Sequence, residues 1–485
     1  MAQEATEQKL EAMRTEKDSL GELQVPASAY YGVQTARAVA NFPISGLRPN
    51  PAFVRATVQI KKAAAIVNAR LGELPQEKAD AIVAAADEVL NGNLSDQFVV
   101  DVFQAGAGTS HNMNTNEVLA NRAIEIIARK ENREAVRGDY KQINPNDHVN
   151  MAQSTNDVIP TAIRLAALQL CEEFYPVLER LQEAFAAKAH EFDGIIKSGR
   201  THLQDAVPIR LGQEFAAYAV SVGKHRRRLH AAAEELKELG IGGTAAGSEL
   251  NAHPRYREEM ARQLSTQTGL QLTPTKNTFE AMQSMAPFVG VSGALRNLAL
   301  DMTRIANDLR LLASGPRTGL AEIELPPVQP GSSIMPGKVN PVLAEMLNMV
   351  CYHVIGNDTT VAMASQAGQL ELNVMMPIIA HDLLEALTVL RNALDAFAVK
   401  CVRGITADAE RCREYAEKSL SLITALNPHV GYLRAAEIAK EMLKTKRGAR
   451  EVTRELGLMD DTQLDEVLDL EDMTGPQIHT GLDSE

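Results

Sequence analysis

Residues 342–376 read VLAEMLNMVCYHVIGNDTTVAMASQAGQLELNVMM, and their pattern decides the fold class. Apolar residues recur at three- and four-residue spacing among good helix formers such as Ala, Leu and Glu, which predicts an α-helix. A helix over this stretch would be roughly 50 Å long at about 1.5 Å per residue. The pattern continues to residue 400, with a kink or break predicted near Pro377. Three other segments predict long helices in the same way: residues 162–196, 211–239 and 279–314.

Helical periodicity extends over almost the whole sequence, which contains no sustained run of alternating strands. Long helices rich in Ala and Leu, in a chain with 4% aromatic residues, predict an elongated bundle. We therefore expect an all-α fold in which other subunits cover much of the apolar surface of the long helices. The composition becomes more polar after about residue 405. Three domains are expected: a mainly helical one at residues 1–150, the long-helix bundle at 151–405 and a small helical one at 406–485.

Charge and composition exclude several classes of partner. The 485 residues contain 49 Lys and Arg against 62 Asp and Glu, a formal net charge of -13, which argues against nucleic acid as a partner. Basic residues cluster at 224–228, but they lie inside an amphipathic stretch. We therefore interpret the cluster as a solvent-exposed helix face and not as a nucleic-acid site. No segment approaches 18 uninterrupted apolar residues, so we expect no membrane span.

The cysteines and the N-terminal residues bear on the cellular compartment. Cys171, Cys351, Cys401 and Cys412 show no ligand-like pairing, which predicts reduced thiols. The N-terminal stretch MAQEATEQKLEAMRTEKDS is charged and lacks the apolar core of a secretory signal. We expect a cytoplasmic protein.

The segments between the predicted helices are unusually polar. They are longer than ordinary connectors and rich in Gly, Ser, Thr, Asn and His. Such side chains and glycine-rich backbone amides suit a small carboxylate, because they donate hydrogen bonds without adding a competing negative charge. The segments are residues 104–117, 144–157, 199–209, 240–254 and 315–341.

These loops supply a candidate site for a small anion, with Lys338 as its fixed cation. Each hydroxyl also has a structural interpretation as a helix cap or a turn residue. His202 is the best acid/base candidate, although a purely structural histidine is the default, and His111 and His148 lie in equally polar loops. The neutral candidates are Thr109, Ser154, Thr155, Asn156, Thr201 and Asn340.

Residues 330–341, PGSSIMPGKVNP, resemble a phosphate-binding loop but do not fit one. Gly331 and Gly337 are separated by five residues instead of four, and Lys338 is followed by Val339 where Ser or Thr is needed. The run Gly-Ser-Ser ahead of Gly-Lys is suited to wrapping backbone amides around an anion and to easing proton loss from a serine. Such a loop suits abstraction of a weakly acidic proton beside a carboxylate. Zinc-like His or Cys spacing is absent from the sequence, so no metal is expected.

GSSIMPGKVNP resembles the signature loop of the fumarase/aspartase superfamily, and the resemblance covers nearly the whole chain. It includes, in the family's order, RTEKDSLGELQVPASAYYGVQT, GAGTSHNMNTNEV, NPNDHVN, QSTND, GRTHLQDAVP and GNDTTVAMASQAGQLELNV. The resemblance implies a mainly helical homotetramer with a twenty-helix core and active sites that each draw on three subunits. It also implies reversible anti-elimination on a four-carbon dicarboxylate, releasing fumarate without a cofactor.

The resemblance assigns roles to individual residues. Ser332 corresponds to the base that takes the Cβ proton, His202 to a histidine that orients substrate and loop, and Glu345 to a glutamate that pairs with that histidine. The remaining matches are substrate-binding positions: Thr109, Ser154, Thr155, Asn156, Thr201, Ser333, Lys338 and Asn340.

The leaving group separates two branches of the superfamily. Residues 106–110, 154–156 and 367–370, with Asn144, resemble the aspartases, whereas residues 242–245 and 471–473 resemble class II fumarases. The first group includes residues that line the site, so we predict release of ammonia from L-aspartate. Class II fumarase is the alternative, followed by lyases that act on other aminodicarboxylates. Met376 and Glu249 depart from the usual aspartase residues. A structural relative without activity is disfavoured by the retained site residues, and an NAD-dependent malate enzyme by the lack of a dinucleotide fingerprint.

Overall fold

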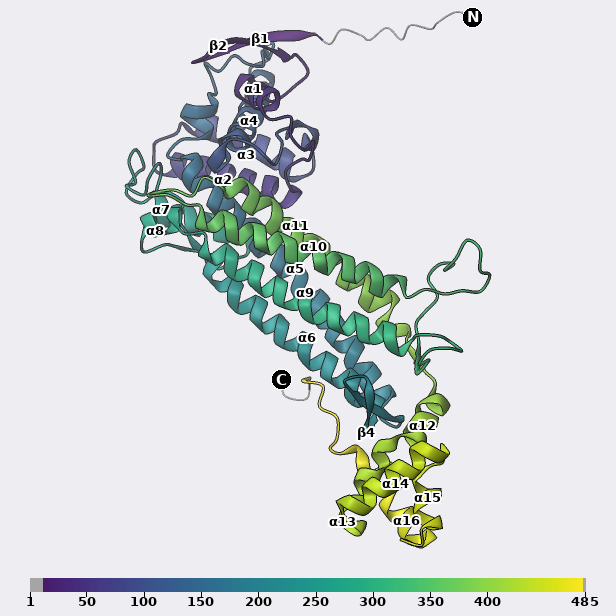
Figure 1. Ribbon diagram of the computed structural model, residues 1–485. Coiled ribbons are helices and arrows are strands. Elements are labelled where there is room, and N and C mark those ends of the chain that lie inside the picture. Colours follow the sequence, from purple (N-terminus) through teal and green to yellow (C-terminus); the bar gives the residue numbers. More distant parts are fainter. Residues whose placement is uncertain (1–11, 483–485) are drawn as a thin grey trace, which may run out of the picture. The chain divides into compact units, whose positions relative to one another are not determined.

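The computed structural model describes residues 12–482 and is mainly helical, which confirms the predicted fold class (Figure 1). The first eleven residues of the charged N-terminal stretch lie outside the described part. The helices are α1 Val33–Asn41, α2 Pro51–Arg70, α3 Gln76–Leu90, α4 Thr109–Lys130, α5 Thr155–Glu191, α6 Leu211–Glu234, α7 Tyr256–Thr268, α8 Thr278–Gln283, α9 Ala286–Leu312, α10 Val342–Gln366, α11 Met376–Lys400, α12 Ala409–Lys418, α13 Ile423–Val430, α14 Tyr432–Thr445, α15 Ala449–Glu455 and α16 Asp461–Val467.

Short strands pair two by two. Three of the pairs are antiparallel and one is parallel. The antiparallel pairs are β1 Met13–Asp18 with β2 Gly21–Pro26, β3 Ile196–Thr201 with β4 Gln204–Arg210, and β7 Ile323–Glu324 with β8 Thr406–Ala407; the parallel pair is β5 Glu238–Leu239 with β6 Thr273–Pro274.

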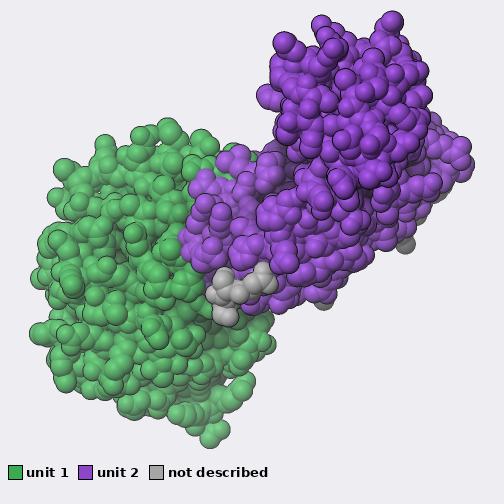
Figure 2. Space-filling model, turned by 90° about the horizontal axis from the view of Figure 1, so that it is seen from below, with its two compact units in different colours: residues 1–173, 229–296, 353–388 green, residues 174–228, 297–352, 389–485 purple. Residues whose placement is uncertain are grey.

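The chain divides into two compact units, coloured separately in Figure 2. The division passes through α5, α6, α9, α10 and α11, each of which contributes residues to both units. The expected three-domain division stays a prediction. Unit 1 comprises residues 1–173, 229–296 and 353–388, and unit 2 comprises residues 174–228, 297–352 and 389–485.

Each unit has its own apolar core. In unit 1, Ala, Val and Ile side chains of α2, α3 and α4 form one buried cluster, including Ile82 and Leu119. In unit 2, helices α12 to α16 enclose a second cluster around Leu426 and Ile438, and these helices lie together in Figure 1. The four cysteines are free and buried, as expected. None of the helices among residues 12–482 is both long and apolar enough to cross a membrane.

The helix predicted over residues 342–376 is shorter than expected. α10 ends at Gln366, and residues 367–375 form a loop before α11. Asn373, which is fully buried, ends the helix because its Nδ2 donates to the carbonyl oxygens of Ala364 and Ser365, at 2.9 and 3.0 Å. Leu370 in this loop has a φ of 52°, which is incompatible with a right-handed α-helix. The break therefore precedes Pro377, which lies in the first turn of α11, where proline is well tolerated.

The other long helices also differ from their predicted limits. The segment 279–314 forms two helices, α8 and α9. Pro287 lies in the first turn of α9, where its lack of an amide proton costs no hydrogen bond within the helix. α5 begins at Thr155 instead of residue 162, and α6 ends at Glu234 instead of residue 239. Residues 199–209, expected as a polar loop, belong to the hairpin β3–β4.

Candidate active site

The predicted site residues are distributed over both units. Thr109, Ser154, Thr155 and Asn156 belong to unit 1, and the other predicted residues belong to unit 2.

In unit 2, the signature loop holds Ser332 inside a turn of its own backbone. The Oγ atom of Ser332 accepts hydrogen bonds from the amides of Ile334 and Met335, at 3.2 and 3.0 Å. Two amide donors on one oxygen stabilise negative charge there, so this geometry favours the alkoxide form of the serine. The same loop borders a cavity of about 480 Å³ that Ser332 and Lys338 line together.

The base of the signature loop is closed by hydrogen bonds. The amide of Gly331 donates to the carbonyl oxygen of Lys338 at 2.8 Å, and Asn340 Nδ2 donates to the carbonyl oxygen of Gly331 at 2.6 Å. A Cβ atom on Gly331 would collide with the Lys338 carbonyl, so the closure needs glycine. Asn340 keeps its second amide proton for a ligand. Ile334 and Met335, at the tip, are exposed, as expected for a loop that closes over a ligand.

Thr201 and His202 lie at the end of the hairpin β3–β4. Thr201 pairs with Gln204, so His202 and Leu203 form a two-residue turn. Both turn residues have positive φ, 55° and 58°, a geometry that normally favours Asn-Gly. His and Leu at such positions are uncommon and mark a functional constraint. The side chains of Thr201 and His202 are exposed.

The structure does not bring His202 and Glu345 together. Glu345 lies in the first turn of α10, where its amide donates to the carbonyl oxygen of Pro341 at 3.1 Å. Among the described residues, no hydrogen bond or ion pair joins it to His202. Their predicted pairing therefore stays a prediction.

In unit 1, the turn at residues 154–157 begins α5 and carries three predicted site residues. Asp157 organises it: its carboxylate accepts hydrogen bonds from the amides of Ser154, Gly242 and Thr244, each at 2.9 Å. Burial raises the pKa of Asp157 to about 6, although the three amides act in the opposite direction. Asn156 Nδ2 donates to the carbonyl oxygen of Ala245 at 2.8 Å. Residues 242–245, a fumarase-like motif in the sequence, therefore support the aspartase-like turn.

A buried lysine beside this turn escaped sequence-based prediction. Lys61 is fully buried, and its Nζ atom lies 2.8 Å from Asn150 Oδ1 and 2.9 Å from Gln153 Oε1. Burial lowers the pKa of Lys61 to about 7. Asn112 joins the same network by donating to Thr155 Oγ1 at 3.1 Å, which leaves the Thr155 proton available to a ligand. The sequence signal for Lys61 was a charged residue on the mainly apolar buried face of α2.

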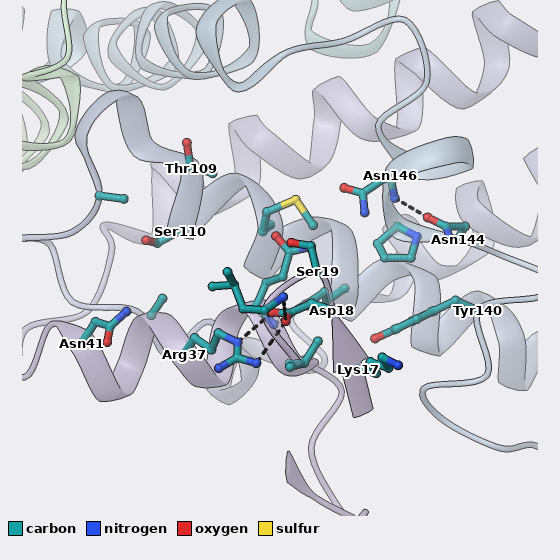
Figure 3. Close-up of a pocket in the computed structure, with 18 of the residues that line it drawn as sticks. Lys17, Asp18, Ser19, Arg37, Asn41, Thr109, Ser110, Tyr140, Asn144 and Asn146 are labelled. Carbon is teal, nitrogen blue, oxygen red and sulfur yellow. Dashed lines mark hydrogen bonds and ion pairs between the residues drawn. The ribbon is translucent and has the colours of Figure 1, made fainter. Parts of the chain in front are cut away.

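Thr109 lines a cavity of about 530 Å³ in unit 1 (Figure 3). Arg37 lies in the same cavity, where it pairs with Asp18 at 2.8 Å. Asn144 also borders it, and its Oδ1 atom accepts from the amides of Asn146 and Asp147, at 2.8 and 3.1 Å. Asn144 therefore caps the short turn Pro145–Val149, a role in which its oxygen is already occupied.

His111 and His148, the alternatives to His202, are held by structural contacts. His111 is buried, stacks on Phe53 with ring centroids 4.3 Å apart, and lies 3.0 Å from Thr57 Oγ1. Burial lowers the pKa of His111 to about 3. His148 Nδ1 accepts from the amide of Asn144 at 2.8 Å. Neither ring is presented to a ligand in the way that the exposed ring of His202 is.

Comparisons with known proteins identify the family of this chain. Residues 21–356, more than half of the chain, match a family described as Lyase, and residues 422–475 match the family Fumarase C C-terminus. An aspartate ammonia-lyase of Pseudomonas aeruginosa is 49% identical over 96% of this chain and 98% of its own length. An aspartate ammonia-lyase of Bacillus subtilis is 48% identical over 96% of this chain and 97% of its own length.

A solved structure extends the likeness to three dimensions. The fumarate lyase:delta crystallin from Brucella melitensis, bound to cobalt, is 52% identical with a TM-score of 0.91, covering 96% of this chain and all of that one. The chain therefore belongs to the fumarase/aspartase superfamily of lyases.

Proposed function

We propose that this chain catalyses the reversible anti-elimination of ammonia from L-aspartate to give fumarate. The observation that carries this proposal is the identity of 48–49% with two aspartate ammonia-lyases over nearly the full length of both partners. The reaction makes the chain a carbon–nitrogen lyase.

The geometry of the signature loop supports Ser332 as the base. In its alkoxide form the Oγ atom takes the Cβ proton of the substrate, and the amides of Ile334 and Met335 stabilise that alkoxide beforehand. Proton removal leaves extra negative charge on the neighbouring carboxylate. Lys338, with Ser333 and Asn340, supplies the cation and the hydrogen bonds that this carboxylate needs.

Residues of unit 1 also bind the substrate in this proposal. Thr155 keeps its hydroxyl proton to donate, because its oxygen only accepts from Asn112. Asn156 keeps its second Nδ2 proton, because the carbonyl oxygen of Ala245 takes only one. Ser154 and Thr109 add hydroxyl groups. Thr201 and His202 approach from the hairpin, with Glu345 orienting His202. The proposal includes a homotetramer whose active sites draw on three subunits, and a cytoplasmic location.

Class II fumarate hydratase is the alternative function. The match of residues 422–475 to the Fumarase C C-terminus favours it. Discrimination between water and ammonia requires only a few hydrogen bonds to the leaving group, so the two activities differ by small changes in one site.

The test measures fumarate formation by ultraviolet absorbance, with purified protein given L-aspartate or L-malate. We expect turnover of aspartate with equimolar ammonia and no turnover of malate. Ser332→Ala protein, purified in the same way, is the control for host lyases in the preparation. Turnover of malate alone would replace the proposal by its alternative, and activity retained by Ser332→Ala would remove Ser332 from its role.

A further inference from the structure

Two adjacent helices of unit 1 place nitrogen and oxygen ligands of the kind that bind metal ions at one point. His381, Asp382 and Glu385 lie on α11, and their ligand atoms all lie within 4.8 Å of one another. His353, on α10, adds a second imidazole, whose Nε2 atom lies 3.0 Å from Glu385 Oε2. Two imidazoles and two carboxylates thus lie close together where α10 and α11 face each other.

The helical spacing produces this convergence. His381 and Glu385 are four residues apart, so their side chains share one face of α11, and His381 Nε2 lies 3.9 Å from the same Glu385 oxygen that contacts His353. Atoms bound to one tetrahedral ion at about 2.0–2.2 Å lie roughly 3–3.5 Å apart. The two histidine Nε2 atoms lie 3.0 and 3.9 Å from Glu385 Oε2, so small side-chain rotations would bring these atoms to the distances expected around one ion.

Neighbouring side chains hold the cluster in place. Asn357, one turn after His353, donates from Nδ2 to Glu385 Oε2 and to the carbonyl oxygen of Asp382, both at 3.3 Å. Asp382 is 7% exposed, so its charge is costly without a nearby cation. In the single chain, half of the His353 side chain is exposed, at 51%, which leaves a path from solvent when no other subunit covers it. A neighbouring side chain that holds a ligand in position, and a path by which the ion can enter, are both features of protein metal sites.

We propose that His353, His381, Asp382 and Glu385 bind one divalent transition-metal ion. Mixed imidazole and carboxylate ligands favour ions such as Zn²⁺, Co²⁺ or Ni²⁺ over Mg²⁺ or Ca²⁺, which take all-oxygen sites. The bound ion links α10 to α11 and so stabilises unit 1. No zinc-like motif in the sequence predicts this site, because its ligands come from two helices and have none of the familiar spacings. The proposal is independent of the proposed reaction.

The first test titrates the full-length chain, treated with chelator and then freed of it, with Co²⁺. Calorimetry measures the stoichiometry and affinity, and the visible absorbance of Co²⁺ reports its coordination. We expect one saturable site per chain and a Tm that rises with bound ion. Absence of saturable binding to the wild-type chain would overturn the proposal whatever the variants do.

Variants then locate the site. Glu385→Gln and His353→Gln should each weaken Co²⁺ binding about tenfold or more. His353 is half-exposed, so its substitution keeps the test valid if Glu385→Gln fails to fold. The matched control is His230→Gln. It removes an exposed histidine on α6 whose Nδ1 atom lies 3.7 Å from Glu234 Oε1, an i,i+4 pair like that of His381 and Glu385. The assignment would be refuted if His230→Gln lost as much Co²⁺ affinity as the cluster variants. It would also be refuted if neither Glu385→Gln nor His353→Gln lost affinity, because the ion would then bind elsewhere.

Discussion

Lys197 Nζ lies 3.0 Å from Glu322 Oε2 in the interior of unit 2, where both side chains are at most 1% exposed. Arg200 reaches the other carboxylate oxygen of Glu322 at 2.8 Å, and Glu214 also pairs with Lys197, at 2.9 Å. Lys197 and Arg200 belong to β3, the strand that leads into Thr201 and His202. This buried ion cluster therefore anchors the hairpin that carries two predicted site residues.

We predict that Glu322→Gln destabilises the chain by about 3–5 kcal/mol, because Lys197 loses a charged partner inside the protein. The hairpin should become less ordered, so kcat/KM should fall as well. Chemical denaturation followed by circular dichroism measures the first effect. Glu324→Gln, at an exposed position two residues further along, is the control. An unchanged midpoint in Glu322→Gln would mean that the ion cluster does not support the fold.

Ser332→Ala should lower kcat by about 100- to 10,000-fold, the range expected for loss of a proton-transferring group. Its helical content should stay the same, because Ser332 contacts only its own loop among the described residues. Ser333→Ala is the matched comparison. It removes the neighbouring exposed hydroxyl, whose proposed role is to bind carboxylate, and should raise KM more than it lowers kcat. Equal kcat values in the two variants would contradict the division of roles.

Asp157→Asn should destabilise the chain by about 1–3 kcal/mol and raise KM. The two carboxylate oxygens of Asp157 accept from three backbone amides, and an asparagine offers only one acceptor oxygen, so at least one buried amide loses its partner. Thermal unfolding and steady-state kinetics test both effects. Asp147→Asn, at an exposed position, should change neither. Wild-type stability and KM in Asp157→Asn would show that the turn needs only one acceptor.

The buried imidazole of His111 should make the chain sensitive to acid. Its pKa is about 3 in the folded chain, below its usual value of 6.5, because burial opposes the charged form. The unfolded chain therefore binds a proton that the folded chain excludes between these pKa values. Stability is fully present above pH 6.5 and falls by up to about 1.4 kcal/mol per pH unit as the pH decreases toward 3.

Replacement of His111 by Gln removes this proton linkage. The variant loses packing and should be less stable than the wild type near neutral pH. The difference should be about 2 kcal/mol smaller at about pH 5 than at about pH 7.5. Unfolding by denaturant at the two pH values measures it, with the exposed His230→Gln as the control. A difference independent of pH would show that His111 does not titrate in this range.

Several features were predictable from the sequence because they depend on local or compositional rules. Helical periodicity identified the long helices, and the motif GSSIMPGKVNP identified the superfamily, which the comparisons confirm. The limits of the helices were less predictable. α10 ends where buried Asn373 reaches back to two carbonyl oxygens, a contact that no propensity scale contains.

The roles of individual polar residues depended on burial. His111 and His202 both lie in polar, glycine-containing segments of sequence, yet one ring is buried against Phe53 and the other is exposed on a hairpin turn. The sequence by itself determined the helical class, the family and the set of candidate residues, because periodicity and motifs are written in consecutive residues. Only the tertiary structure decided which charges are buried, as Lys61 and Glu322 are, and which ligands meet, as on α10 and α11. Burial and convergence depend on distances between segments that are far apart in the chain.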